Sequence, residues 1–229
     1  MSEEKIKGKI TIIKNGPYEV SGGVSIYEKV IVPKGRGYEL RDGRELPQEE
    51  NYALCRCGKS KNAPFCDGSH RTKGFSGEET ASRQKYHDRA ERIEGASVDL
   101  LDDGRCAFGR FCHRQNGNAW ELAEASAEGD NRQEAIRAAT ECPAGRLTAV
   151  DKDGTEHEDD YAPSIEIVQD PERRVSAGIF VKGRIPIVSA DGVEYEVRNR
   201  VALCRCGESE DKPFCDASHV TTRYQDRNS

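Results

Sequence analysis

The sequence is poor in apolar residues for its length. Of 229 residues, 35% are hydrophobic and 33% are charged, and the mean hydropathy is −0.81. No stretch approaches the roughly 18 apolar residues of a membrane span, so we expect a soluble protein. The length allows two or three small domains, each with little apolar surface to bury. Some interaction other than burial is therefore expected to stabilise them.

The sequence also lacks an export signal and a surplus of positive charge. The N-terminal stretch MSEEKIKGKI has no apolar segment with a cleavage-like site, which favours a cytoplasmic protein. The net charge is −6, and lysines and arginines are interspersed with acids, so we expect no nucleic-acid partner. Nucleotide-binding and serine-nucleophile motifs are absent from the sequence, and we predict no catalytic residues.

Cysteine, by contrast, is abundant. Nine cysteines in a protein expected in a reducing compartment favour metal binding or redox chemistry over disulfides, and their odd number argues against complete pairing. Residues 55–70 read CRCGKSKNAPFCDGSH and residues 204–219 read CRCGESEDKPFCDASH. Short β-branched runs precede each segment, so the sequence predicts an internal duplication with two β-rich copies.

The predicted elements fall into three segments. Strands are expected at 10–13, 18–26 and 29–33 in the first copy, and at 164–168, 179–182, 185–188 and 193–197 in the second. Between the copies, strands are expected at 97–101 and 146–151, and a helix capped by Asp130 and Asn131 over 132–141. The predicted domains are 1–80, 81–160 and 161–229.

Each repeated segment offers three thiols and one imidazole as metal ligands. They are Cys55, Cys57, Cys66 and His70 in the first copy, and Cys204, Cys206, Cys215 and His219 in the second. Thiolate and imidazole suit zinc, iron or an iron–sulfur cluster better than Mg²⁺ or Ca²⁺. One tetrahedral zinc ion and one [2Fe–2S] cluster with two ligands per iron would use the same four atoms, and the spacing alone does not separate them.

The rest of the repeated segment carries a resemblance. The pattern C-x-C-x2-S-x3-P-F-C-D-(G/A)-S-H, present twice, resembles the CDGSH iron–sulfur domain family. The shared positions include Ser60 and Ser209, Pro64 and Pro213, and Phe65 and Phe214. The resemblance implies one [2Fe–2S] cluster per copy, with Cys55 and Cys57 on the inner iron, Cys66 and His70 on the outer iron, and Cys204, Cys206, Cys215 and His219 acting likewise. It also implies that the two motifs pair across a pseudo-two-fold axis within one chain, so that a monomer suffices.

The second copy departs from the family pattern at Ala217, which replaces a glycine. A left-handed backbone at this position would cost alanine about 1 kcal/mol or more. Because Asp216 can cap a short helix with Ala217 in its first turn, we expect the alanine to be tolerated.

Three further cysteines lie between the copies. They are Cys106, Cys112 and Cys142, the last followed by Pro143. Bacterial ferredoxins carry a C-x2-C-x2-C run and a remote Cys-Pro, and here Gly109 takes the middle position of that run. Residues 96–152 therefore resemble a divergent single-cluster ferredoxin domain. The resemblance implies a [3Fe–4S] cluster, which we favour, or a [4Fe–4S] cluster completed by an exogenous ligand or His113; three ordinary buried cysteines are the alternative.

The predicted fold class is α+β, with two β-rich CDGSH halves forming a pseudo-symmetric module and a ferredoxin-like α+β domain inserted between them. The predicted function is electron transfer or redox sensing through two [2Fe–2S] clusters and one [3Fe–4S] or [4Fe–4S] cluster, with a redox partner protein that the sequence does not identify. Delivery of clusters to apo-proteins is the alternative, followed by a zinc-stapled interaction scaffold.

Overall fold

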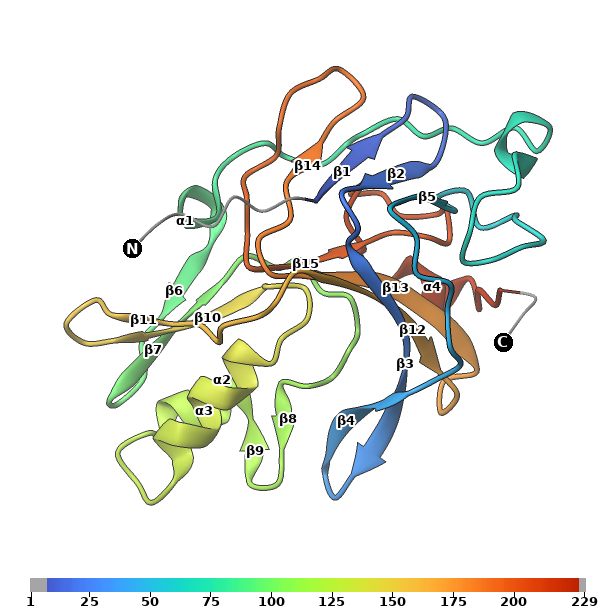
Figure 1. Cartoon of the computed structure of the whole chain (residues 1–229). Helices are drawn as coiled ribbons and strands as arrows, with labels where there is room; N and C mark the ends of the chain where they lie inside the picture. The colour runs from blue at the N-terminus through green and yellow to red at the C-terminus, as the bar shows by residue number, and fades with distance from the viewer. Residues whose placement is uncertain (1–7, 227–229) are drawn as a thin grey trace.

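The computed structural model describes residues 8–226, which fold mostly into β-strands with a few short helices. Within these residues the strands form four sheets (Figure 1). The helices are α1 (Tyr86–Arg89), α2 (Ala119–Glu124), α3 (Asn131–Thr140) and α4 (Ser218–Thr221), with a 3-10 turn, η1, at Ser69–Arg71. The predicted α+β character thus applies to the middle of the chain, and the whole is mostly β. No helix in this part of the chain is both long and apolar enough to cross a membrane.

The first sheet combines strands of both copies. Its members are β1 (Lys9–Ile12), β2 (Tyr18–Ser21), β5 (Asn51–Leu54) and β14 (Ile187–Val188). In the order β14-β1-β2-β5, β2 pairs antiparallel with both β1 and β5. The strand β14 comes from the second copy and runs parallel to β1, with Ile187 opposite Ile10.

The second sheet repeats this arrangement with the copies interchanged. Its members are β3 (Ser25–Lys34), β4 (Gly37–Asp42), β12 (Ser164–Asp170), β13 (Val175–Lys182) and β15 (Arg200–Leu203). In the order β15-β13-β12-β3-β4, β13 pairs antiparallel with β12 and β15. The strand β3 comes from the first copy and runs parallel to β12, with Ile26 opposite Ile165. The second copy thus contributes β14 to the first sheet, and the first copy contributes β3 and β4 to the second sheet.

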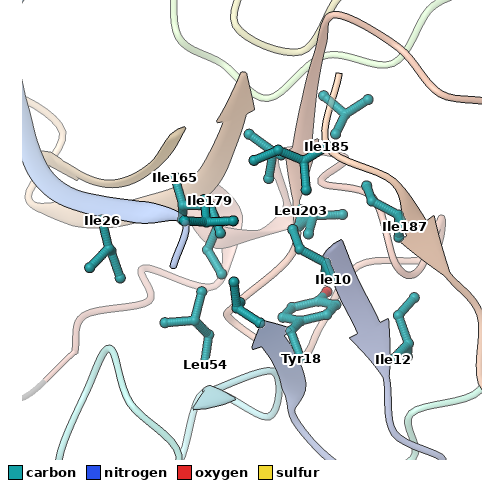
Figure 2. Packing of buried hydrophobic residues seen from close by; sticks show 14 of the residues in the cluster. Ile10, Ile12, Tyr18, Ile26, Leu54, Ile165, Ile179, Ile185, Ile187 and Leu203 are labelled. Atoms are coloured by element: carbon teal, nitrogen blue, oxygen red, sulfur yellow. The ribbon is translucent and has the colours of Figure 1, made fainter. Parts of the chain in front are cut away.

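The two sheets share one hydrophobic core. Isoleucines of β1, β12 and β13 and the segment around β14 point toward one another in Figure 2, and Ile10, Ile165 and Ile179 are fully buried there. Alternate residues of β1 and β2 are buried, the pattern of strands with one face on a core. The two copies bury their apolar side chains in a single shared core. Two separate cores would each be small, so sharing one core compensates for the low apolar content of each copy.

The central strands β12 and β13 are covered on both faces. Their opposite face supplies Val168 and Phe180 to a second core, to which the middle segment contributes Ala107 and Phe111. This explains why β12 and β13 are buried along almost their whole length.

The middle segment has a sheet of its own. It contains β6 (Glu91–Ile93), β7 (Val98–Asp102), β10 (Leu147–Asp151) and β11 (Glu156–His157), in the order β11-β10-β7-β6, and a separate hairpin joins β8 (His113–Arg114) to β9 (Gly117–Asn118). Helices α2 and α3 cover this sheet, and their small side chains Ala119, Ala135 and Ala139 allow close packing. Helix α3 starts one residue before the predicted range, and the Asp130 side chain makes no capping hydrogen bond.

Two strand predictions differ from the structure. Residues 18–26 form two strands, because Gly22 and Gly23 take positive φ angles of 87° and 67° and turn the chain. Residues 193–197 form no strand; a single bridge joins Glu194 to Val188.

Candidate metal centres

Each CDGSH-like loop begins directly after a strand and turns back at once. Cys55 follows β5 and Cys204 follows β15. The sulfur atoms of Cys55 and Cys57 lie 3.7 Å apart, and those of Cys204 and Cys206 lie 3.5 Å apart. The hydrogen bond from the second thiol lowers the pKa of Cys55 and of Cys204, and backbone N–H groups of the loop act in the same direction. A thiol with a lowered pKa gives up its proton to a metal more readily.

The second ligand pair of each loop comes from a short helical turn. In the first copy η1 places the Nδ1 atom of His70 3.4 Å from the Cys66 sulfur, and in the second copy α4 places Nδ1 of His219 3.4 Å from the Cys215 sulfur. Both histidines therefore present the same nitrogen to the adjacent thiol.

Serine and aspartate of the repeated segment hold the loop in shape. The hydroxyl of Ser60 donates to the carbonyl oxygen of Phe65 at 2.6 Å, and Ser209 repeats this bond to Phe214 at 2.7 Å. The carboxylate of Asp67 accepts from the backbone N–H groups of Lys61 and Ser69. These bonds lower the pKa of Asp67 to about 2, so its carboxylate stays ionised. These serine and aspartate hydrogen bonds fix the shape of the loop and do not use the cysteine sulfur atoms, which stay available to bind metal.

A buried arginine stands between the first two cysteines of each loop. Arg56 and Arg205 are each 1% exposed. Arg56 donates to the carbonyl oxygens of Ile13, Gly16 and Gly77 at 2.9–3.0 Å. Such a charge is costly to bury unless it is hydrogen-bonded and has negative charge nearby, and the flanking cysteines would supply that charge as metal-bound thiolates.

Arg205 makes the corresponding bonds in the second copy. It donates to the carbonyl oxygens of Ala177 and Val168 at 2.7 and 2.8 Å and forms an ion pair with Asp226. Sequence reasoning missed both arginines, although CRCG is repeated unchanged in the two copies.

The two loops differ in their access to solvent. Cys66 and His70 are half-buried, whereas Cys215 is 3% and His219 is 2% exposed. Burial, followed by the nearby charge of Arg205, lowers the pKa of His219 to about 4, which keeps its imidazole neutral. The second centre is therefore an interior site and the first is a surface site.

Ala217 does not sit in a helical turn, so that prediction was wrong. It has φ of 70°, a left-handed conformation, and it precedes α4 as the N-cap residue. The matching Gly68 has φ of 84°. The glycine in the family pattern meets a backbone requirement, and the alanine satisfies it at a cost of about 1 kcal/mol.

The two loops touch each other within the chain. A Cβ atom built on Gly58 would lie 2.1 Å from the carbonyl oxygen of Cys206, and one on Gly207 would lie 2.7 Å from the carbonyl oxygen of Cys57. Both glycines have positive φ. In addition, the hydroxyl of Tyr18, from the first copy, donates to the carbonyl oxygen of Cys204 at 2.8 Å. The reciprocal contacts place the two CDGSH-like loops side by side.

The donor atoms fit a binuclear cluster. Each loop presents a thiol–thiol pair and a thiol–imidazole pair, which matches two ligands on each of two irons. Among the residues that the structure describes, no three His, Cys, Asp or Glu side chains converge on a single metal position.

Two of the three middle cysteines, Cys112 and Cys142, pack against the same hydrophobic core. Cys106 and Cys112 flank the loop before β8, and Cys142 follows α3. Burial, followed by the charges of Cys142 and Cys106, raises the pKa of Cys112 to about 11. The guanidinium of Arg200 donates to the carbonyl oxygen of Cys142 at 2.7 Å and brings positive charge to this group.

The fourth ligand position of the middle loop has no donor. A Cβ atom on Gly109 would lie 2.9 Å from Cγ of Pro143, so this position is closed by the Cys-Pro segment. His113 is exposed on β8, where its backbone pairs with Asn118. Three cysteine thiols without a fourth protein donor suit a cuboidal iron–sulfur cluster that lacks a fourth protein thiolate.

Two protein-family models match the segments that contain these cysteines. A model described as iron-binding zinc finger CDGSH type matches residues 15–71 and 177–220, and a model described as divergent 4Fe-4S mono-cluster matches residues 93–152. Searches among curated proteins and solved structures gave no significant match. The predicted domain limits near 80 and 160 fall between the matched segments and stay predictions. The chain carries two iron-binding CDGSH regions that flank a divergent 4Fe-4S mono-cluster domain.

Proposed function

We propose that the protein transfers electrons through three iron–sulfur centres. This proposal rests on the contacts between the three loops that carry the candidate ligands. The two CDGSH loops are in backbone contact. The middle cysteine loop shares a buried core with Cys215, a candidate ligand of the second CDGSH loop. Centres gathered in one body suit electron exchange, whereas a zinc scaffold has no need of such contact.

The proposed cofactors are two [2Fe–2S] clusters and one cluster with three cysteine ligands. Cys55, Cys57, Cys66 and His70 would hold the first, Cys204, Cys206, Cys215 and His219 the second, and Cys106, Cys112 and Cys142 the third. For the third we propose [3Fe–4S], because Gly109 offers no donor and Pro143 fills the space beside it. Bound clusters would supply one-electron chemistry, and the protein would set their order and their access to solvent.

The test is metal and sulfide analysis of anaerobically purified protein, followed by a potentiometric titration monitored by EPR. We expect iron and sulfide without stoichiometric zinc, reversible reduction of all three centres, and a paramagnetic signal from the oxidised [3Fe–4S] centre. A colourless zinc-loaded protein would overturn the proposal. A middle centre that is EPR-silent when oxidised and paramagnetic when reduced would replace [3Fe–4S] with [4Fe–4S].

The exposure of the first CDGSH site favours a second candidate function, delivery of a [2Fe–2S] cluster to an apo-protein. Cys66 and His70 are half-buried, so an acceptor thiol can reach the outer ligand pair of the first site, and the buried Cys215 and His219 give no such access. Incubation with an apo-ferredoxin distinguishes the two functions: delivery predicts loss of one cluster to the acceptor, and electron transfer predicts unchanged iron content.

We also propose that the chain works as a monomer with respect to CDGSH pairing. The exchange of β3 and β14 completes both sheets within one chain. Light scattering of the cluster-loaded protein should give the mass of a single chain.

A further inference from the structure

The three candidate centres do not follow one another in space as they do in sequence. Along the chain the order is first CDGSH loop, middle cysteine loop, second CDGSH loop. In the fold, the second CDGSH loop contacts both of the others.

The contact between the second CDGSH loop and the middle loop runs through residues next to the ligands. Arg105, which precedes Cys106, stacks over the ring of Phe214 with its guanidinium carbon 4.3 Å from the ring centre, and it donates to Asp211 at 2.9 Å. Phe214 itself precedes Cys215. The neighbour of a middle ligand thus lies directly on the neighbour of a second-loop ligand.

A shared core reinforces this contact. Cys215 is buried in one cluster with Ala107 and Phe111 of the middle loop, and Ala144 of the Cys-Pro segment packs against it.

An ion pair fixes the middle loop to the sheet beneath the second loop. Arg110, which lies two residues before Cys112, donates to both carboxylate oxygens of Asp170 at 2.6 and 3.1 Å. Arg110 is 8% and Asp170 is 1% exposed. A buried bidentate pair of this kind has a defined geometry, so it sets the register between the two loops.

The first CDGSH loop is linked to the second, not to the middle loop. Its backbone at Cys57 and Gly58 meets Cys206 and Gly207, and Lys59 lies 3.8 Å from Glu208. In the described part of the chain, Arg56 donates to Ile13, Gly16 and Gly77 of the first copy.

From these contacts we infer that the second CDGSH site is an internal relay between the middle cysteine site and the first CDGSH site. With clusters bound, Cys106, Cys112 and Cys142 would hold the centre at one end of this route, and the second CDGSH loop would hold the intermediate centre. One electron would be exchanged at each step, with no net gain or loss of atoms or protons among the three. The inference rests on the proposed electron-transfer function and adds the route and the position of the exchange site.

In this relay the two CDGSH sites have different roles. Cys215 and His219 are shielded from solvent, so the second site is suited to internal exchange. Cys66 and His70 are half-buried, so the first site is suited to exchange with an external one-electron carrier.

The test uses the cluster-loaded protein and two matched variants, Cys204→Ser/Cys206→Ser and Cys55→Ser/Cys57→Ser, each lacking one CDGSH centre. After partial reduction with substoichiometric dithionite, freeze-quench EPR follows the redistribution of electrons. Removal of the second centre should slow exchange between the middle and first centres by about tenfold or more. Removal of the first should leave exchange between the middle and second centres at the wild-type rate. An unchanged middle-to-first rate without the second centre would overturn the relay.

A measurement on the unmodified protein keeps the inference testable if a variant does not fold. Spin relaxation of the middle-site signal should be faster when the second CDGSH centre is paramagnetic than when only the first is. The opposite ranking would overturn the spatial order. If the centres are reduced reversibly but either test contradicts the relay, the relay alone fails; if they cannot be reduced reversibly, the electron-transfer function fails.

Discussion

The carbonyl oxygen of Cys206 lies only 2.1 Å from the point where a Cβ atom on Gly58 would stand. Because Gly207 meets Cys57 in the same way, the two CDGSH loops approach each other as closely as two backbones can. The glycine after the second cysteine is therefore needed for contact between the two centres, in addition to the turn at positive φ.

Gly58→Ala should separate the two loops. We expect a loss of about 2–4 kcal/mol, since the new methyl group combines a left-handed backbone with overlap against a carbonyl oxygen. Gly74→Ala is the matched control: Gly74 has φ of 65° but nothing within 4 Å of its Cβ position, so only about 1 kcal/mol should be lost. Thermal melting and iron content measure both. Equal losses would show that the contact is unimportant.

Ala217→Gly should stabilise the second loop. Glycine relieves the left-handed backbone at φ of 70°, a gain of about 1 kcal/mol reduced by the greater freedom of glycine in the unfolded chain. The reverse exchange, Gly68→Ala, should destabilise the first loop by a similar amount, because no atom lies within 4 Å of its Cβ position. Decay of visible absorbance at raised temperature reports both, and a faster decay in Ala217→Gly would contradict the argument.

Acid should release iron from the first CDGSH site before the second. Protons and water reach the half-buried Cys66 and His70 more readily than the buried Cys215 and His219, and lower pH increases the competition of protons for the imidazole ligand. His70→Cys should slow this loss and lower the reduction potential, because thiolate donates more charge than neutral imidazole. Absorbance decay and voltammetry over a pH series measure these effects. Simultaneous loss from both sites would contradict the expected order.

Asp99→Asn should destabilise the middle domain. Burial alone would raise the pKa of Asp99, but hydrogen bonds from Lys152, the Gly95 N–H group and Arg92 outweigh it and lower the pKa to about 2. The unfolded carboxyl has a higher pKa, so this stabilisation of about 2 kcal/mol is complete at neutral pH and is lost as pH falls through about 4 to 2. Urea unfolding should give a constant deficit from about pH 5 to 8. A deficit that changes within that range would contradict this assignment.

Removal of the metal should loosen the ligand loops more than the sheets. Residues 55–70 and 204–219 form no strand, whereas β12 and β13 lie between two cores. Ligation should therefore contribute much of the stability of the loops. Hydrogen exchange after chelation should rise first in the two loops, with a lower melting temperature. Unchanged exchange and melting would show that metal is not needed for the folded state.

Much of the fold could be predicted from the sequence, because the repeated segment contains a recognisable set of potential metal-ligating residues. The spacing of Cys55, Cys57, Cys66 and His70 predicts the donors, and the duplication predicts two such regions, which the family match shows. The spacing does not show which atoms approach which, since the strand exchange and the Arg105–Phe214 contact depend on residues more than 100 positions apart.

The local predictions failed where the backbone overrides side-chain preference. Asp216 looks like a helix cap, and its carboxylate does accept from the Ser218 N–H group, yet the residue between them, Ala217, takes a left-handed conformation. The segment 193–197 reads VEYEV, with valine and tyrosine alternating with glutamate, but the neighbouring β14 is only two residues long and offers little to pair with. In both places the tertiary environment decides.

The exchange of β3 and β14 also affects the order of events during synthesis. On the ribosome, β3 emerges well before its parallel neighbour β12, which begins at Ser164. At about 5–20 residues per second, the first CDGSH loop must wait some seconds to tens of seconds for the strand that completes its surroundings. Its cysteines are exposed as free thiols during that interval. Insertion of the first cluster is therefore tied to completion of the whole chain, and a truncated product would leave an unpaired β-edge beside reactive cysteines.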